Sequence, residues 1–305
     1  MITSLVTGGA GFIGSVLTQK LLHLGHKVIV IDNESSDAHE QFYWNKRAEN
    51  HKLDIRDYNS TRPLYDGVDY VFHLAAEARI QPSIINPIEA TSNNVIGTIT
   101  VLQCSREARV KRLMYSSTSS AYGLNKTPNV ETQFDDRLNP YSVSKVAGEK
   151  ICSMYYKLFG LPTIIFRYFN VYGEHQPIRG QYSPVIGIFM RQKENNQPLT
   201  IVGDGEQKRD FVNVYDVVDA NILASQTSDN FNFFGEVFNV GSGKSYTINQ
   251  IASLISDKKI YVPSRKGEAK ETLADITKIN KILGWSPKVN LEKWIKENLL
   301  ELPRC

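Results

Sequence analysis

Short hydrophobic runs alternate with longer amphipathic stretches through the first half of the chain. The runs are typical of buried strands and lie at 2–7, 27–32, 70–74, 112–118 and 163–168. Hydrophobic residues at helical spacing occupy the stretches at 12–24, 88–108 and 141–159. Because a helix that connects two parallel strands makes a right-handed crossover, this alternation predicts an α/β fold with a parallel, doubly wound sheet.

Glycine, proline and asparagine mark the ends of the predicted helices. Gly25 can end the first helix in a left-handed conformation, and Gly160 can end the third, with Pro162 just beyond it. Asn139 and Pro140 are the residue types preferred at the N-cap and at the first helical position. The predicted helices therefore have matching start and stop signals.

The pattern changes after about residue 170. Loops become longer and richer in turn residues, and the helices become shorter, with one between Asp275 and Gly284 and the last at 290–302. The change predicts a second, smaller α/β domain without a clean linker. The expected larger domain is 1–170 with a return around 211–240, and the smaller is 171–210 and 241–305. Residues 34–50 are polar and irregular, and we expect a surface excursion there.

A glycine-rich turn connects the first predicted strand to the first helix. Residues 5–14 read LVTGGAGFIG, with glycines at 8, 11 and 14. Gly8 allows a tight turn, Gly11 lets the backbone approach a pyrophosphate, and Gly14 lets helix and sheet pack closely. The amides at the helix N-terminus then face the phosphate charge. The turn predicts a dinucleotide site.

An acidic residue ends the second predicted strand. Asp32 can accept two hydrogen bonds from a ribose diol and would repel a 2′-phosphate. No arginine occurs in the next dozen residues to favour NADP. A structural role for Asp32 as a turn cap is the alternative. We expect NAD.

Tyr141 and Lys145 form a Y-x-x-x-K motif in NPYSVSK. Their spacing places both side chains on one face of a helix. A phenol with an ordinary pKa of about 10 must lose roughly three units, or about 4 kcal/mol, to act as a base near neutral pH. A neighbouring ammonium and a cationic nicotinamide can lower the phenol pKa in this way. The motif follows the hydroxyl-rich strand end SSTSSAYG at 116–123, where ligands bind in open α/β sheets.

Composition excludes several classes of protein. The 305 residues are 41% hydrophobic and 22% charged with a net charge of +3, which gives little reason to expect nucleic-acid binding. No hydrophobic run is long enough to span a bilayer, and the first residues run straight into a strand, so neither a membrane anchor nor a signal peptide is expected. The three cysteines, Cys104, Cys152 and Cys305, fit reduced thiols in the cytoplasm. The histidines lack ligand spacing, so no metal is expected.

Motifs along nearly the whole chain resemble those of the extended short-chain dehydrogenase/reductase family, with its Rossmann fold, and especially its UDP-glucose and UDP-N-acetylglucosamine 4-epimerases. The motifs are TGGAGFIG, HLAA at 73–76, NNVIGT at 93–98, SSTSSAYG, YSVSK, RYFNVYG at 167–173, VGDGEQKRDFVNVYDV at 202–217, NVGSG at 239–243 and RKGE at 265–268. The resemblance implies that the larger domain binds NAD and the smaller one a nucleotide sugar.

The same resemblance implies residue roles. Tyr141 would be the general base, Lys145 would hold the nicotinamide ribose and lower the phenol pKa, and Thr118 would bind the sugar O4 hydroxyl. Asp54 would contact adenine, and Asn94 would be the structural asparagine behind the lysine. The other implied cofactor contacts are Gly8, Gly11, Phe12, Ile13, Gly14, Asp32, Asn33, Ile55, Leu74, Ala75, Ala76 and Tyr168. The implied substrate contacts besides Thr118 are Asn170 and Arg209 at the diphosphate, Arg265 and Glu268 at the nucleotide, and Thr272 at the sugar.

The residues after Thr118 distinguish family members that catalyse different reactions. Related 4,6-dehydratases carry Asp-Glu there and UDP-glucuronate decarboxylases carry a Glu, whereas this chain has Ser119 and Ser120. Without a carboxylate, elimination and decarboxylation lose their acid/base partner. The resemblance then implies oxidation and re-reduction at C4, which gives C4 epimerisation through a transient 4-keto sugar. Thr272 is small, so we expect N-acetylated UDP-hexosamines to be accepted alongside or instead of UDP-hexoses.

Two other functions remain open. One is a nucleotide-sugar reductase or another epimerase of the extended family, which would need added cofactor. The other is a non-catalytic dinucleotide-binding regulator, which would not need the set Thr118, Tyr141 and Lys145.

The resemblance also implies a homodimer through the helices at 88–108 and 141–159, although their hydrophobic residues can equally face the core of their own chain.

Overall fold

The computed structural model describes residues 1–39, 41–178, 183–228 and 230–300. Within them, seven parallel strands form the central sheet in the order β10-β6-β5-β4-β1-β2-β3. Their bounds are β1 Thr3–Thr7, β2 Lys27–Asp32, β3 Glu49–Lys52, β4 Tyr70–His73, β5 Arg112–Thr118, β6 Thr163–Tyr168 and β10 Val237–Val240. This is the predicted doubly wound α/β fold.

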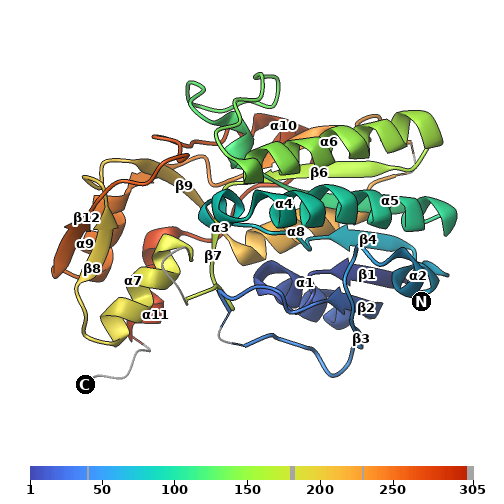
Figure 1. The fold of residues 1–305 in the computed structure, drawn as a ribbon, viewed down its shortest axis with the longest axis horizontal. Helices are drawn as coiled ribbons and strands as arrows, with labels where there is room; N and C mark the ends of the chain where they lie inside the picture. Colours follow the sequence, from blue (N-terminus) through green and yellow to red (C-terminus); the bar gives the residue numbers. More distant parts are fainter. Residues whose placement is uncertain (40, 179–182, 229, 301–305) are drawn as a thin grey trace.

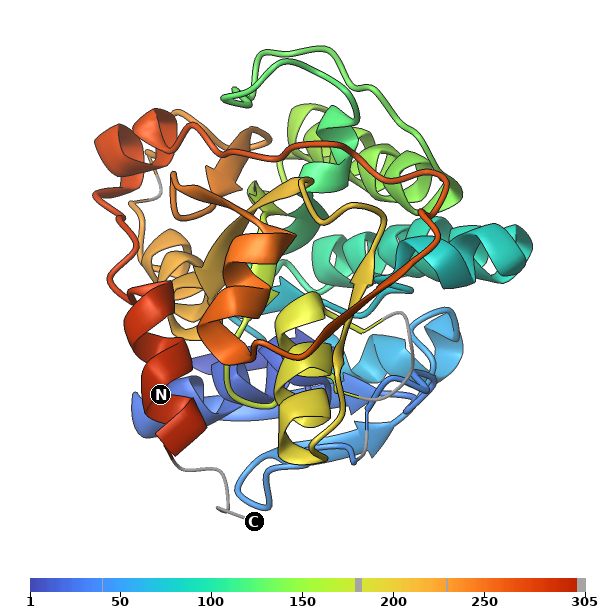
Figure 2. The same cartoon turned by 90° about the vertical axis from the view of Figure 1, so that its left-hand side faces the viewer.

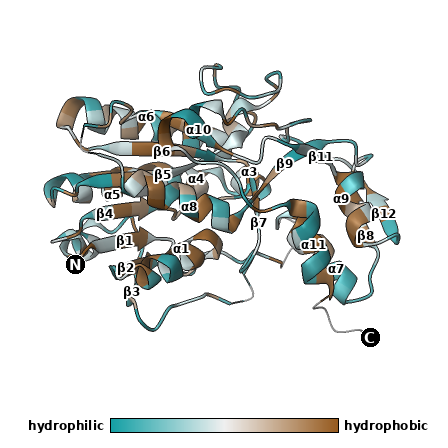
Figure 3. Ribbon diagram, turned by 180° about the vertical axis from the view of Figure 1, so that it is seen from behind, coloured by the Kyte–Doolittle hydropathy of each residue, from teal (hydrophilic) through white to brown (hydrophobic). Residues whose placement is uncertain are grey.

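Helices cover both faces of this sheet (Figures 1 and 3). Alternate residues of a strand point to opposite faces, so Val28 and Val30 pack with α1 and α8, whereas Ile29 and Ile31 pack on the side of α5 and α6. The helices on the first side are α1 Phe12–His23, α8 Val214–Ser225 and α10 Thr277–Leu283. Those on the other side include α4 Pro87–Thr91, α5 Gly97–Glu107 and α6 Pro140–Phe159. The strands inside the sheet are consequently hydrophobic on both faces.

A second group of elements lies beyond one end of the central sheet and faces the viewer in Figure 2. Two small sheets, β11-β9-β7 and β12-β8, and three helices share a separate hydrophobic cluster in the described part of the chain. Their bounds are β7 Asn170–Tyr172, α7 Val185–Glu194, β8 Leu199–Val202, β9 Lys208–Asn213, β11 Ser245–Thr247, α9 Ile248–Ile255, β12 Lys259–Val262 and α11 Leu291–Leu300. The remaining short helices are α2 Tyr58–Thr61, η1 Arg62–Tyr65, α3 Ile80–Ile85, η2 Ser92–Ile96 and η3 Ser119–Tyr122.

The predicted helix ends are confirmed. Asn139 caps α6 by accepting a hydrogen bond from the Ser142 amide, and Pro140 is its first residue. Gly25, Gly160 and Gly284 all have positive φ beyond helix ends. The last helix was expected at 290–302, but α11 spans Leu291–Leu300, and residues 301 and 302, like Cys305, lie outside the described residues. Cys104 and Cys152 are buried free thiols.

Two elements differ from prediction. The single helix expected at 88–108 is α4 followed by the π-helical turn η2 and then α5. The edge strand β3, which pairs with β2, falls partly in the excursion expected at 34–50, because its sequence ENHK has no hydrophobic residue. Polar sequence at a sheet edge gives no period-two signal.

Candidate active site

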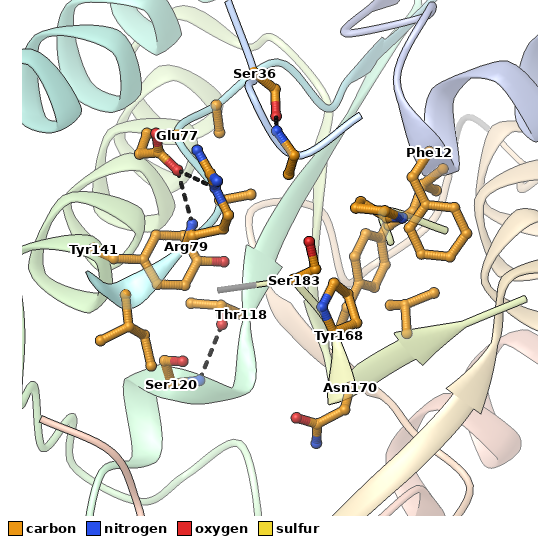
Figure 4. Close-up of a pocket in the computed structure, with 18 of the residues that line it drawn as sticks. Phe12, Ser36, Glu77, Arg79, Thr118, Ser120, Tyr141, Tyr168, Asn170 and Ser183 are labelled. Atoms are coloured by element: carbon orange, nitrogen blue, oxygen red, sulfur yellow. Dashed lines mark hydrogen bonds and ion pairs between the residues drawn. The ribbon is translucent and has the colours of Figure 1, made fainter. Parts of the chain in front are cut away.

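A cavity of about 960 Å³ lies along the carboxyl ends of the central strands and extends to the second group of elements. It is lined by the glycine turn after β1, the ends of β2, β4 and β5, the start of α6, and residues of β7, β9 and the 265–272 segment. Ligands of open α/β sheets bind at such carboxyl ends. Figure 4 shows part of the lining, with Tyr141 and Arg79 on one side and Phe12 and Tyr168 on the other.

The glycine turn has the geometry that a pyrophosphate requires. Gly8 has φ +70°, and a Cβ there would lie 2.7 Å from the Ala75 amide nitrogen. A Cβ on Gly14 would lie 2.1 Å from the Gly8 carbonyl oxygen, so both positions exclude a side chain. A Cβ on Gly11 would meet nothing closer than 3.4 Å. Gly11 lines the cavity at the N-terminus of α1, where the backbone leaves room for an anion.

Asp32 ends β2 at the cavity with its side chain buried. Its Oδ2 accepts a hydrogen bond from the Ala10 amide at 3.1 Å, and its Oδ1 accepts one from the Glu34 amide at 2.8 Å. Burial raises the pKa of this carboxyl, and the amide hydrogen bonds oppose that shift. Asp32 thus also has the turn-capping role considered as its alternative. The Gly11 amide also acts on this carboxylate, and its remaining lone pairs can accept from a ribose hydroxyl.

Tyr141, Lys145 and Thr118 converge on the cavity, and all three are buried. The first two lie one turn apart on α6, and the Tyr141 amide donates to Ser83 Oγ at 3.0 Å. Thr118 ends β5, and its Oγ1 accepts a hydrogen bond from the Ser120 amide at 3.0 Å (Figure 4). The structure therefore brings the sequence-predicted catalytic set together.

Among the protein groups alone, burial outweighs the interaction that lowers the pKa of Tyr141. Burial raises the pKa of Tyr141 to about 12; the Glu77 carboxylate adds to the rise, and a hydrogen bond with Thr118 opposes it. Burial also lowers the pKa of Lys145 to about 8, and its Nζ lies 4.4 Å from the centre of the Tyr115 ring. With a pKa of about 8, Lys145 is still mostly an ammonium at neutral pH.

Glu77 and Arg79 are site residues that sequence reasoning missed. Both line the cavity on the loop after β4, and Arg79 Nε donates to Glu77 Oε1 at 3.3 Å (Figure 4). Two charged residues directly after the buried strand that ends in HLAA were the available signal. Ser119 and Ser120 also line the cavity, and the carboxylate that acts on the Tyr141 phenol, that of Glu77, comes from the loop after β4.

Two predicted cofactor residues lie outside the cavity lining. Asp54 forms a two-point ion pair with Arg56, at 3.0 Å to Nε and 2.7 Å to Nη2, and accepts from Asn33 Nδ2 at 3.3 Å. The hydrogen bond with Arg56 lowers the pKa of Asp54. Asn94 is buried behind α6, where it donates to Ser144 Oγ, while its neighbour Asn93 lines the cavity. The predicted contact of Asp54 with adenine stays a prediction.

The other predicted cofactor residues all line the cavity: Phe12, Ile13, Asn33, Ile55, Leu74, Ala75, Ala76 and Tyr168. Tyr168 is fixed by Asn221, whose Nδ2 donates to its hydroxyl at 2.7 Å. Phe12 and Ile13 begin α1, and Leu74 to Ala76 directly follow β4. One continuous wall of the cavity thus joins the glycine turn to the catalytic set.

The predicted substrate residues line the other end of the cavity. Arg209 Nη2 lies 3.6 Å from a Glu268 carboxylate oxygen, and burial lowers the pKa of this arginine. Arg265 lines the same region. The buried Thr272 hydroxyl accepts hydrogen bonds at 3.3 Å from Asn170 Nδ2 and from the Asp210 amide. A cation and an amide at this end can bind a diphosphate.

The described residues contain no group of three or more His, Cys, Asp or Glu side chains arranged to hold a metal ion. They also contain no helix with the length and apolar character needed to cross a membrane.

The geometry agrees with comparisons to known proteins. The model of the NAD dependent epimerase/dehydratase family matches residues 4–241. A putative UDP-glucose 4-epimerase of Methanocaldococcus jannaschii is 36% identical over 96% of this chain and 95% of that protein. A UDP-N-acetyl-alpha-D-glucosaminuronate decarboxylase of Bacillus cytotoxicus is 35% identical over 97% and 96%. The crystal structure of a Thermotoga maritima UDP-glucose 4-epimerase with UDP-glucose has a TM-score of 0.91 at 37% identity, covering 98% of both chains.

Proposed function

This chain belongs to the NAD-dependent epimerase/dehydratase family, and from that premise we propose that it epimerises a UDP-hexose or UDP-N-acetylhexosamine at C4. NAD is the cofactor. The observation that carries the proposal is the convergence of Tyr141, Lys145 and Thr118 on one cavity with the glycine turn. A reductase would need reduced cofactor from solution at each turnover, whereas an epimerase works with the NAD that it holds.

The chain has the residues to hold NAD. The open backbone at Gly11 and the N-terminus of α1 would take the pyrophosphate, and Asp32 would accept from the adenosine ribose. Lys145 would donate to the nicotinamide ribose. When bound, NAD supplies a group that takes a hydride from a sugar carbon and can return it.

Proton transfer falls to the chain's own side chains. Tyr141 in its phenolate form removes the proton from the sugar O4 hydroxyl, and Thr118 donates a hydrogen bond that orients this oxygen. The 4-keto sugar then rotates in the cavity so that its opposite face is presented, and Tyr141 returns its proton to O4. Because burial raises the pKa of Tyr141 to about 12, the phenolate form would need the combined positive charge of Lys145 and oxidised NAD.

The nucleotide end of the substrate would bind in the second group of elements. Arg209 and Asn170 are placed to hold the diphosphate, and Arg265 with Glu268 the nucleotide. Thr272 would form a wall of the sugar pocket, where its small side chain leaves room for an N-acetyl group. This assignment makes 1–170, with the return at 211–240, the NAD part of the chain, and 171–210 with 241–305 the substrate part, except that α10 packs on the central sheet.

A decarboxylase is the second candidate, because one of the relatives above carries that name. Glu77 places a carboxylate near Tyr141, but its Oε1 is engaged by both the Arg79 amide and Arg79 Nε. The two positions after Thr118, where decarboxylases of the family carry an acid, are serines. Epimerisation therefore fits the site better.

A panel of UDP-sugars tests the choice. The purified protein is incubated, with no cofactor added, with UDP-glucose, UDP-N-acetylglucosamine and their uronic-acid forms, and the products are identified by NMR. We expect C4-inverted products from the neutral sugars. Formation of a UDP-pentose and CO₂ from a uronic-acid substrate would refute epimerisation and show that the protein is a decarboxylase.

We also propose a homodimer. The helices that cover one face of the sheet carry exposed apolar side chains, among them Ile88 at 83% and Ile96 at 51% exposure on α4 and η2, and Val143 at 50% and Leu158 at 67% on α6. Apolar residues gathered on adjacent helices favour pairing with a second copy. Light scattering after gel filtration should give twice the chain mass, and Ile88→Glu together with Leu158→Glu should give a monomer.

A further inference from the structure

Two loops face each other across the NAD end of the cavity. Ser35, Ser36 and Ala38 line it from the segment after β2, and Ala78 and Arg79 line it from the loop after β4. Arg79 lies between Tyr141 and the segment that carries Ser36 in Figure 4. A contact between the two loops would therefore lie over the bound cofactor.

One ion pair connects the loops. Arg79 Nη1 lies 2.6 Å from Asp37 Oδ1. The guanidinium is held on its own side, because Arg79 Nε and the Arg79 amide both donate to Glu77 Oε1, at 3.3 Å and 3.1 Å. The arginine side chain is 17% exposed, whereas the aspartate is 85% exposed. Arg79 is thus a fixed cation that reaches across the cavity to a carboxylate at the solvent edge.

The segment after β2 is attached at both ends. At its start the Glu34 amide donates to Asp32, and Glu34 has φ +56°, a conformation that turns the chain sharply. Further along, the Tyr43 amide donates to the Ala10 carbonyl at 2.8 Å, and the Tyr43 ring stacks on His175 with centroids 3.7 Å apart. The ion pair therefore joins the middle of an otherwise anchored segment to the opposite wall.

We propose that Asp37 and Arg79 form a clasp that closes residues 33–39 over bound NAD and slows its release. The inference rests on the proposed function, since an epimerase that reuses its NAD gains from slow release. An exposed ion pair is weak and is screened by salt, so the clasp opens readily. Its loss should speed release by roughly two- to fivefold.

The release of NADH from the full chain tests the clasp. Protein loaded with fluorescent NADH is mixed with excess NAD, and the loss of bound fluorescence gives the release rate. We expect Asp37→Asn and Arg79→Gln to speed release by the same factor, with the difference from wild type disappearing in about 1 M salt. The double variant Asp37→Asn with Arg79→Gln should release NADH no faster than either single variant, because both changes remove the same interaction. Asp66→Asn is the control, because it removes an exposed ion pair, 2.7 Å from Arg62, outside the cavity lining.

Unchanged release in Asp37→Asn would overturn the clasp. Faster release in Arg79→Gln alone would also overturn it, since the arginine would then act on the cofactor directly. The release assay does not depend on turnover, so the two proposals can fail separately. If the protein converts none of the UDP-sugars but both variants show the salt-sensitive effect, the proposed reaction is refuted and the clasp stands.

Discussion

Asn94 Nδ2 donates a hydrogen bond to Ser144 Oγ across 2.9 Å, and both side chains are buried. The bond joins the π-helical turn η2 to α6 one residue before Lys145. The same amide donates to the Glu77 carbonyl at 3.0 Å, and Asn94 Oδ1 accepts from the Glu77 amide at 2.8 Å. One buried side chain thus fixes the loop after β4 against the catalytic helix. Local π-helical turns often occur at functional sites.

Asn94→Ala should lower both stability and activity. The substitution leaves the Glu77 amide and carbonyl without their buried partner, so we expect a loss of about 2–4 kcal/mol in the free energy of unfolding. Loss of positioning at Glu77 and α6 should lower kcat roughly ten- to a hundredfold. Urea denaturation and a turnover assay measure the two effects. Asn93→Ala on the same turn should change stability by less than about 0.5 kcal/mol, and an equal loss in that control would count against the proposed role of Asn94.

Tyr141→Phe should abolish most turnover and keep the cofactor. Removing a general base costs about 10²- to 10⁴-fold in kcat. The backbone bond from the Tyr141 amide to Ser83 is unaffected, so the fold and the NAD content should be those of the wild type. The control is Tyr215→Phe, which removes an exposed phenol bonded to Glu174. Wild-type turnover in the Tyr141→Phe protein would show that another group moves the proton.

The buried charge of Lys145 should make stability depend on pH. The folded pKa is lowered from 10.5 to about 8 because burial disfavours the ammonium, so between pH 8 and 10.5 the unfolded chain binds more protons than the folded one. Stability therefore rises with pH across that window. After NAD is removed, the wild type should gain stability relative to Lys145→Met between about pH 7.5 and 10 in urea denaturation. A constant difference would mean that the folded pKa of Lys145 is not lowered.

Thr272→Tyr should lower turnover of the N-acetylated substrate and not that of the plain hexose. A tyrosine at this cavity wall would fill the space assigned to an N-acetyl group, so turnover of UDP-N-acetylglucosamine should fall at least about tenfold while UDP-glucose turnover is retained. Thr272→Val is the matched control: it keeps the size but loses the hydrogen bonds from Asn170 and Asp210, and it should affect both sugars equally. Full UDP-N-acetylglucosamine turnover in the tyrosine variant would refute the assignment.

Buried elements were predictable from the sequence. The bounds of β5 and β6 agree with their hydrophobic runs, because a parallel strand buried on both faces is hydrophobic throughout. The capping residues Asn139 and Gly160 marked the ends of α6 through local backbone chemistry. The family markers then led to the cavity, since most of the residues they named line it.

What the sequence did not predict depends on contacts between distant segments. Glu77 and Arg79 belong to no recognised motif, and only the folded chain places them beside Tyr141 and opposite Asp37. The pKa of Tyr141 was expected to fall under the joint charge of Lys145 and a cationic nicotinamide; among the protein groups alone, burial raises this pKa. The burial of a side chain depends on all the segments that form the cavity, so it cannot be read from residue spacing along one helix.

The central claim is that hydrogen leaves and returns to the same sugar carbon while Tyr141 moves the O4 proton. UDP-glucose or UDP-N-acetylglucosamine labelled with deuterium at C4 is incubated with the purified protein without added cofactor, and the product is examined by NMR. We predict a C4-inverted sugar that retains its deuterium at C4. A product that has lost the deuterium to solvent, or a substrate left unchanged by protein that carries NAD, would contradict the account.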